Sequence, residues 1–172
     1  MIEIKPFRAF LPKKGLAERI STRPINSYSE EEIKRLKSNH PYSFLNIILH
    51  DDESKEMKLK ERFKKIKKLF KKSIEDSVFK QSKKETIYIY RQTKGDNSYT
   101  GLIAGASTKD YQNGKIKKHE HTLEKREKLF TKYLSLTGFN AEPILLIYPE
   151  NKDLSTLLEL KTKELPKFSF VS

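Results

Sequence analysis

Residues 55–84 read KEMKLKERFKKIKKLFKKSIEDSVFKQSKK, and this stretch decides the fold. Its apolar side chains recur at steps of three to five residues, which places them on one stripe of a helix: Phe63, Ile66, Phe70, Ile74 and Phe79. Ser54 or Asp52 is suited to cap the start of that helix. We therefore predict an amphipathic helix whose apolar stripe belongs to the core.

The same stretch carries most of the charge of the chain. It holds 12 lysines and one arginine against four acidic residues, an excess of nine within a net charge of +13. Such a run is most often a solvated face, and it also suits contact with an acidic partner or nucleic acid. Attachment to a membrane surface would need the apolar stripe that the core uses. The stretch has no interleaved aromatic residues and no recognisable nucleic-acid motif, so charge alone does not choose between the first two.

The length and composition favour one domain over residues 1–172. Apolar residues make up 35% and charged residues 34% of the 172 positions, and the apolar residues fall into periodic runs, which is typical of a folded core. No cysteine is present, which excludes disulfides and thiolate metal sites and suits a reducing compartment. The start has no signal-peptide pattern, and no apolar run approaches membrane-spanning length. We expect a cytoplasmic protein without membrane contact.

The first half of the chain predicts three elements around the basic helix. Residues 2–12 alternate as a strand, with prolines at its edge and end. Ser29 and Glu32 form a capping box that opens a short helix over 30–39. The run HPYSFLNIILH, residues 40–50, is nearly continuously apolar, so we predict a buried strand.

The second half predicts a hairpin and further alternating elements. Residues 85–93 and 99–107 are strand-like, and KGDNS between them is a hairpin signal. Glycines 101 and 105 leave room for a close neighbour, and 110–114 form a turn. A helix over 123–136 should follow Thr122 and end at Gly138. We expect its inward face to hold Leu129, Phe130, Tyr133, Leu134 and Leu136.

Three further elements complete the expected fold. Residues 142–149 should form a buried strand, 151–160 a short helix and 166–172 a final strand. The elements lack a strict βαβ rhythm. The fold class predicted is therefore α+β, with a mixed, mainly antiparallel sheet and about four helices packed on it.

The segment KKHEHT, residues 117–122, is the candidate site. It precedes a helix whose first N–H groups attract anions. Lys117, Lys118 and His119 would reinforce that field, and Thr122 would add a hydroxyl. Glu120 lies where a general base would be needed. A phosphate, nucleotide or carboxylate ligand suits this arrangement.

Two observations leave alternatives open. Glu124 in the first helical turn already complements the helix dipole, so a plain polar loop remains an alternative. His119 and His121, with His50 or Glu120, are a candidate metal pair. Because a histidine pair without a fixed third ligand is a weak pattern, we predict no metal.

Several ordered motifs resemble the domain of unknown function 1015 family. They are IKPFRAFLP at 4–12, NHPYSFLNI at 39–47, IYIYRQT at 87–93 with TGLIA after it, DYQNGKIKKHEHT at 110–122 and FNAEPILLIY at 139–148. The resemblance covers essentially the whole chain. Members typically carry Pro-Tyr-Asp-Val where residues 24–28 read PINSY, and Asp-Arg where Leu129 and Phe130 stand.

The resemblance implies a phosphate- or nucleotide-handling enzyme, of which this chain is either the N-terminal portion, the alternative we favour, or a shortened member. Members are longer, and a downstream Asp-Gly-His-His-Arg string is similar to ParB/sulfiredoxin-like proteins, some of which are nucleotide-using kinases of free serine. Lys117, Lys118 and His119 would then neutralise phosphate, Glu120 would orient or deprotonate a hydroxyl, and Thr122 would hold the helix start. A nucleotide is the cofactor this implies for the full-length protein, and the isolated chain should be inactive.

The alternative is a non-enzymatic binding module. In that hypothesis the basic helix contacts an acidic partner or nucleic acid. The partners expected are therefore a small-molecule or nucleotide ligand, a nucleic acid, or a missing C-terminal half or second copy that pairs with the last strand.

Overall fold

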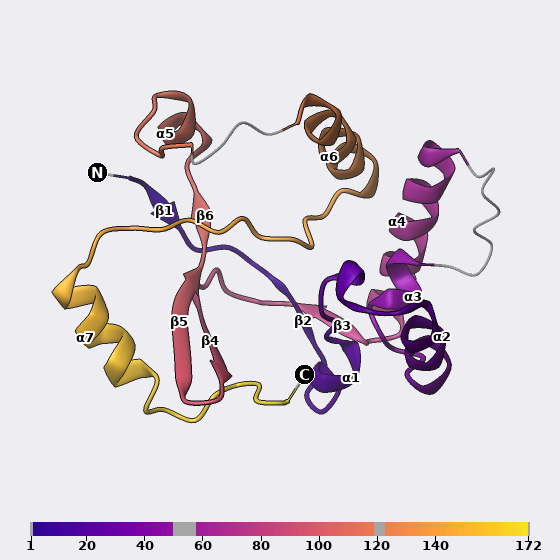
Figure 1. Ribbon diagram of the computed structural model, residues 1–172, viewed down its shortest axis with the longest axis horizontal. Coiled ribbons are helices and arrows are strands. Elements are labelled where there is room, and N and C mark those ends of the chain that lie inside the picture. Colours follow the sequence, from indigo (N-terminus) through magenta and orange to yellow (C-terminus); the bar gives the residue numbers. More distant parts are fainter. Residues whose placement is uncertain (1, 50–57, 119–122, 172) are drawn as a thin grey trace. The chain divides into compact units, whose positions relative to one another are not determined.

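The computed structural model describes residues 2–49, 58–118 and 123–171, and it has the predicted α+β composition (Figure 1). Its strands are short and are divided among three two-stranded sheets, β1–β6, β2–β3 and β4–β5. The chain separates into two compact units. The first unit comprises Met1–Ala9, Gln81–Thr122 and Asn140–Lys167, and the second comprises Phe10–Lys80, Leu123–Phe139 and Phe168–Ser172. The prediction of one domain over residues 1–172 stays a prediction.

The elements follow one another along the chain in this order: β1 (Ile4–Lys5), β2 (Phe10–Pro12), α1 (Ala17–Ile20), η1 (Ile25–Ser27), α2 (Glu30–Asn39), α3 (Leu45–Ile48), α4 (Leu59–Glu75), β3 (Phe79–Gln81), β4 (Tyr88–Lys94), β5 (Asn97–Ile103), β6 (Gly105–Ala106), α5 (Thr108–Gln112), α6 (Glu124–Thr137) and α7 (Lys152–Lys161). None of the helices in the described ranges combines the length and apolar character that crossing a bilayer requires.

Helix α4 is the centre of the second unit, as its periodicity predicts. Phe63, Ile66 and Phe70 are buried on its inner stripe. They form one apolar core with α1, α3 and β3, through Ile20, Ile47, Val78 and Phe79. The ring of Phe70 lies 4.1 Å from that of Phe139 and 5.6 Å from that of Phe79, between ring centroids.

The predicted stripe is longer than the helix that carries it. Helix α4 ends at Glu75, and Ser77 has a φ of 59°, so the chain turns before Phe79 enters β3. Phe79 is nevertheless buried in the same core. The proposed caps Ser54 and Asp52 lie outside the described residues.

The prediction of a buried strand over 40–50 is wrong. Residues 45–48 form the short helix α3, and Leu45 and Ile47 are buried there. Phe44 donates its backbone N–H to the carbonyl of Ile20, which places α3 against α1. A short apolar run fits a buried strand and a buried helical turn equally well, so its pattern did not distinguish them.

Helix α6 has the predicted extent and a narrower buried face than predicted. Gly138 ends it with a φ of 78°, as expected of a glycine at this position. Tyr133 and Leu136 pack on the core. Leu129, Phe130 and Leu134 are exposed, which corrects their predicted inward orientation. Helix α6 packs mainly on α4, so its buried stripe is narrower than that of a helix buried on several sides.

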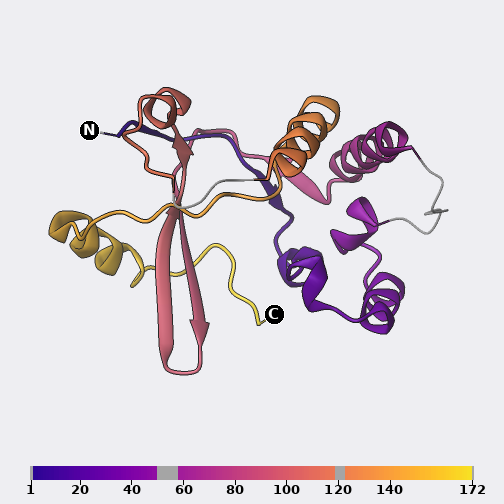
Figure 2. The same ribbon diagram turned by 45° about the horizontal axis from the view of Figure 1, so that its top comes forward.

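The first unit is built around the hairpin β4–β5. The predicted hairpin is present, and its strands pair from Tyr88 with Ile103 to Lys94 with Asn97. The connection is therefore a two-residue turn, Gly95 and Asp96, shorter than the predicted KGDNS. Figure 2 shows this hairpin from a second direction. The predicted strand over 2–12 is interrupted after Lys5, and its first part pairs with β6. A Cβ on Gly105 would meet the carbonyl of Lys5 at 3.4 Å, whereas Gly101 faces open space.

Residues 142–149 do not form the predicted buried strand. They carry no regular secondary structure, and Ile144, Leu145 and Ile147 are 78%, 88% and 90% exposed. Residues 166–171 are likewise not a strand. The β-forming composition of both segments is real, but no strand of the described chain pairs with either. Helix α7 is present as predicted, with the Asn151 side chain accepting the N–H of Leu154 at 2.9 Å.

Truncation of Phe70 tests the central role of α4. Phe70→Ala should lower the free energy of unfolding by about 3–5 kcal/mol, because it removes a buried ring from a packed cluster. Lys68→Ala, on the outer face of the same helix, should change it by less than about 0.5 kcal/mol. Urea denaturation followed by circular dichroism measures both. Equal effects of the two changes would contradict the assigned inner and outer faces.

Candidate functional site

The segment predicted as a site lies partly within the described residues. Lys117 and Lys118 are described, and both side chains are exposed. His119, Glu120 and Thr122 lie outside the described residues, as do His121 and His50. The proposed phosphate wall therefore stays a prediction. Nor does the described part of the chain contain a group of three histidine or carboxylate side chains placed to hold a metal.

A buried carboxylate anchors the loop that leads to Lys117. Asp110 on α5 is 5% exposed, and its two oxygens accept hydrogen bonds from the Lys115 ammonium and the Glu3 backbone N–H, both at 2.7 Å. The hydrogen bond from Lys115, followed by that from Glu3, lowers the pKa of Asp110 below its ordinary value. Its carbonyl also accepts the N–H groups of Lys115 and Ile116. The predicted turn over 110–114 is thus partly helical, with Gly114 at a φ of 71°.

This arrangement changes the charge available at the predicted site. Lys115 is occupied by Asp110, so its ammonium is already neutralised. The ammonium of Lys118 lies 5.2 Å from the centroid of the Tyr111 ring, within the range of a cation–π contact. Lys117 has no ion pair with another residue in the described ranges. Of the two lysines before residue 119, Lys118 therefore contacts an aromatic ring and Lys117 is exposed to solvent.

The helix that follows the segment starts with acidic side chains. Leu123 occupies the N-cap position of α6 without a side-chain hydrogen bond. Glu124 and Glu127 lie in the first turn, and Glu124 pairs with Lys128 at 2.6 Å. A hollow of about 530 Å³ runs over the outer face of this helix, lined by Glu124, Glu127, Lys128, Thr131, Lys132 and Ser135. The negative first turn already satisfies the helix dipole, as Glu124 indicated in the sequence.

The outer face of α4 is rich in exposed lysines and also carries the exposed Glu61 and Glu75. We call it the lysine face, and its exposed lysines are Lys60, Lys64, Lys67, Lys68, Lys71 and Lys72. Four of these lysines, 60, 64, 68 and 72, recur every four residues and form one ridge about 18 Å long. Only Lys71 has an ion pair with a described residue, Glu75, at 3.7 Å.

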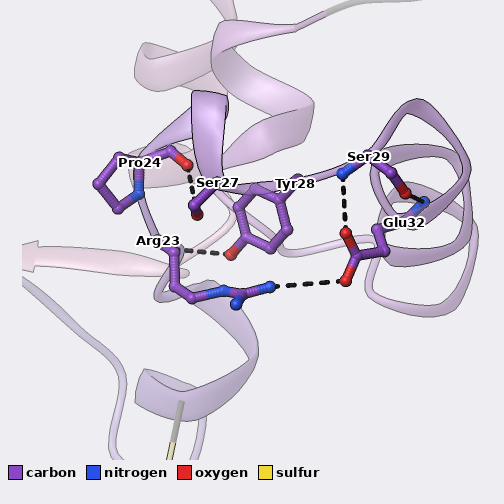
Figure 3. Close-up of polar contacts among 6 residues, drawn as sticks. All are labelled: Arg23, Pro24, Ser27, Tyr28, Ser29 and Glu32. Carbon is purple, nitrogen blue, oxygen red and sulfur yellow. Dashed lines mark hydrogen bonds and ion pairs between the residues drawn. The ribbon is translucent and has the colours of Figure 1, made fainter.

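The first loop, residues 23–29, is held by contacts of Arg23 that the sequence analysis did not predict. The N–H of Arg23 donates to the Tyr28 hydroxyl at 2.7 Å, and the Arg23 guanidinium lies over the Tyr28 ring, 4.5 Å from its centroid (Figure 3). The same guanidinium pairs with Glu32 at 3.6 Å. The sequence signal for these contacts is the short spacing between an arginine, a tyrosine and a helix cap.

The capping box at α2 completes this loop. The Ser29 hydroxyl accepts the Glu32 N–H at 3.2 Å, and the Glu32 carboxylate accepts the Ser29 N–H at 2.7 Å (Figure 3). The backbone hydrogen bond from Ser29 is the main cause that lowers the pKa of Glu32. The predicted capping box is therefore confirmed. These contacts occupy the polar groups of the loop with one another, which indicates a structural role.

The fold defines the class of this protein as an α+β protein with a basic helix. The family model described as "Protein of unknown function (DUF1015)" matches residues 4–172. The chain belongs to this family, as its motifs suggested. Neither a curated protein nor a solved structure matches the chain.

The Asp110 anchor predicts a defined dependence of stability on pH. Its folded-state pKa is lowered from an ordinary value of 3.8, so its contribution is present above that value and is lost as the pH falls through the folded pKa. Asp110→Asn should therefore destabilise the protein at neutral pH and have progressively less effect in acid. Urea denaturation across the acid range measures this, with Asp96→Asn in the hairpin turn as the control. A difference that does not vary with pH would contradict the assigned ionised state.

Proposed function

We propose that this protein is a binding module that holds a polyanion against the lysine face of α4. The observation that carries the proposal is the excess of lysines over the exposed Glu61 and Glu75 on the solvent side of one helix. Six exposed lysines lie on one side of a 17-residue helix whose other side is buried through Phe63, Ile66 and Phe70.

The spacing of the lysines supports a bound polyanion over a merely solvated face. Lysines four residues apart repel one another and weaken a helix, and the lysine face contains four such pairs. Mixed charges would solvate the helix without this repulsion. An anion lying along the ridge would remove it and release counterions from the partner. The ridge length of about 18 Å matches the rise of about five base pairs or an equivalent acidic segment.

The overall charge supports the same function. A net charge of +13 draws polyanions from a distance and raises the rate of encounter. Because nine of these charges come from residues 55–84, the attraction is directed toward the region of α4.

Neutralising the lysine face tests this proposal. A variant with glutamine at positions 60, 64, 67, 68, 71 and 72 should elute from heparin at much lower salt, and its binding to mixed RNA should depend less on salt. Each lost phosphate contact reduces the slope of log affinity against log salt by about 0.7 for single strands. The matched control changes Lys13, Lys14, Lys34, Lys125, Lys152 and Lys163, which removes the same total charge from other surfaces. Equal losses of binding in both variants would show that binding depends only on net charge, which would end the proposal.

A second candidate function is phosphate handling by residues 117–122 in the full-length protein. The observation that favours it is the contact of Lys118 with Tyr111, which holds one cation beside the exposed Lys117. Glu120 would orient or deprotonate a hydroxyl, and the lysines would stabilise charge developing on a transferred phosphoryl group.

Nucleotide turnover by the full-length protein tests this candidate. Glu120→Gln should lower kcat at least about 100-fold if its carboxylate is the general base. Glu124→Gln is the control, since that carboxylate is paired with Lys128 in the described structure. Unchanged turnover in Glu120→Gln would remove Glu120 from the mechanism.

A further inference from the structure

The two faces of the hairpin β4–β5 differ in whether their side chains form hydrogen bonds with one another. On one face, the Arg91 side chain donates to the Thr100 hydroxyl at 3.3 Å, and the Thr93 and Ser98 hydroxyls are 2.9 Å apart. Those side chains bond across the hairpin to one another. The register places residues 88, 90, 92 and 94 of β4 on the other face, beside residues 103, 101, 99 and 97 of β5.

That other face presents two open aromatic rings. Tyr90 is 54% exposed and Tyr99 is 66% exposed. Within the described part of the chain, neither ring contacts another ring and neither hydroxyl has a hydrogen bond. Tyr88 differs, since its ring meets Phe7 edge to face at 5.4 Å and its hydroxyl lies 2.8 Å from that of Ser82. Tyr88 thus anchors the base of the hairpin, and the other two tyrosines are available.

The surroundings of the two rings are open and polar. Tyr90 lies opposite Gly101, where a Cβ would meet nothing within 4 Å. Tyr99 lies opposite Gln92, and Lys94 and Asn97 follow toward the turn on the same face. Tyr90 and Tyr99 are diagonal neighbours, about 7–8 Å apart along such a ladder. The face therefore offers two flat rings, two amide side chains and one cation.

We propose that this tyrosine face, Tyr90 and Tyr99 with Gln92, Lys94 and Asn97, binds unpaired bases of a single-stranded nucleic acid. Aromatic side chains on the face of a sheet stack two or three successive bases, and neighbouring amides reach base edges. A duplex keeps its bases stacked internally, so it cannot offer them to these rings. The inference rests on the proposed function, because it names the class of polyanion that the lysine face would hold.

The net positive charge of the chain favours a nucleic acid over another partner for these rings. Stacking on an open tyrosine suits a sugar ring as well as a base, but a neutral sugar gains nothing from a chain of net charge +13. An acidic protein would pair with the lysines and would not need the two open rings of the tyrosine face. A single-stranded nucleic acid offers both phosphates and unpaired bases, so its chemistry suits each kind of surface taken by itself.

Truncating the two rings tests the inference. The probe is a fluorescein-labelled single-stranded RNA of about a dozen nucleotides, measured by anisotropy beside a duplex of the same length and beside heparin. Tyr90→Ala and Tyr99→Ala should each weaken single-strand binding about fivefold or more, because stacking on one ring is lost. Duplex and heparin binding should be unchanged. Tyr90→Phe and Tyr99→Phe should bind like the wild type, since phenylalanine keeps the aromatic face.

Tyr42→Ala is the matched control, since Tyr42 is 46% exposed in the turn before α3. Alanine variants that bind single strands as the wild type does would overturn the tyrosine face. So would phenylalanine variants as weak as the alanine variants, because the hydroxyls would then be the binding groups. If the glutamine variant of the lysine face keeps wild-type affinity, the proposed function fails. The tyrosine variants, made in the wild-type background, test base binding by the hairpin separately. Failure of the wild-type protein to bind single strands at low salt would end this inference, and failure to bind the duplex and heparin as well would end the proposed function.

Discussion

The structure of the second unit depends on burial of one stripe of α4. Phe63, Ile66 and Phe70 all belong to one apolar core. The ring of Phe70 meets that of Phe10 from before the helix, and the ring of Phe63 meets that of Tyr133 from after it. Such burial is the dominant favourable term in folding and is roughly proportional to the apolar area removed from water. The first unit has no comparable cluster of buried residues in the described ranges, and its elements are held by ladder pairing and by polar anchors such as Asp110.

The same constraint fixes the direction of the lysine face. A helix that must turn one stripe inward has no freedom to rotate, so the opposite residues face solvent in a fixed register. Lys67 illustrates the limit of that face, because its ammonium lies 3.9 Å from where a Cβ on Gly138 would be. A cation at this position lies near the C-terminal end of α6 and interacts favourably with its carbonyl groups. Among the lysines further round the helix, only Lys71 has an ion pair with a described residue, Glu75.

The elements that the sequence predicted correctly are those whose signals are local. The capping box at Ser29 and Glu32, the Gly95 turn and the stripe of α4 each depend on residues a few positions apart. The errors at 40–50 and 142–149 concern short apolar runs, whose conformation depends on which distant segment packs against them. The candidate site was predicted in the same way. Its two described lysines are exposed, and their predicted role stays a prediction. The hydrogen bond from the Glu3 N–H to Asp110 joins residues more than a hundred positions apart, so no local pattern indicated it.

Residues 144–148 form an exposed surface that is apolar, whereas the lysine face is charged. An exposed apolar run with strand-forming residues is prone to pair with any free strand edge, including one in a second copy. The net charge of +13 opposes such pairing, because two copies repel one another before their strands meet. Charge on the chain therefore has two physical effects that do not conflict. It keeps like chains apart, and it attracts a partner of opposite sign, whose binding would reduce the repulsion that separates the copies.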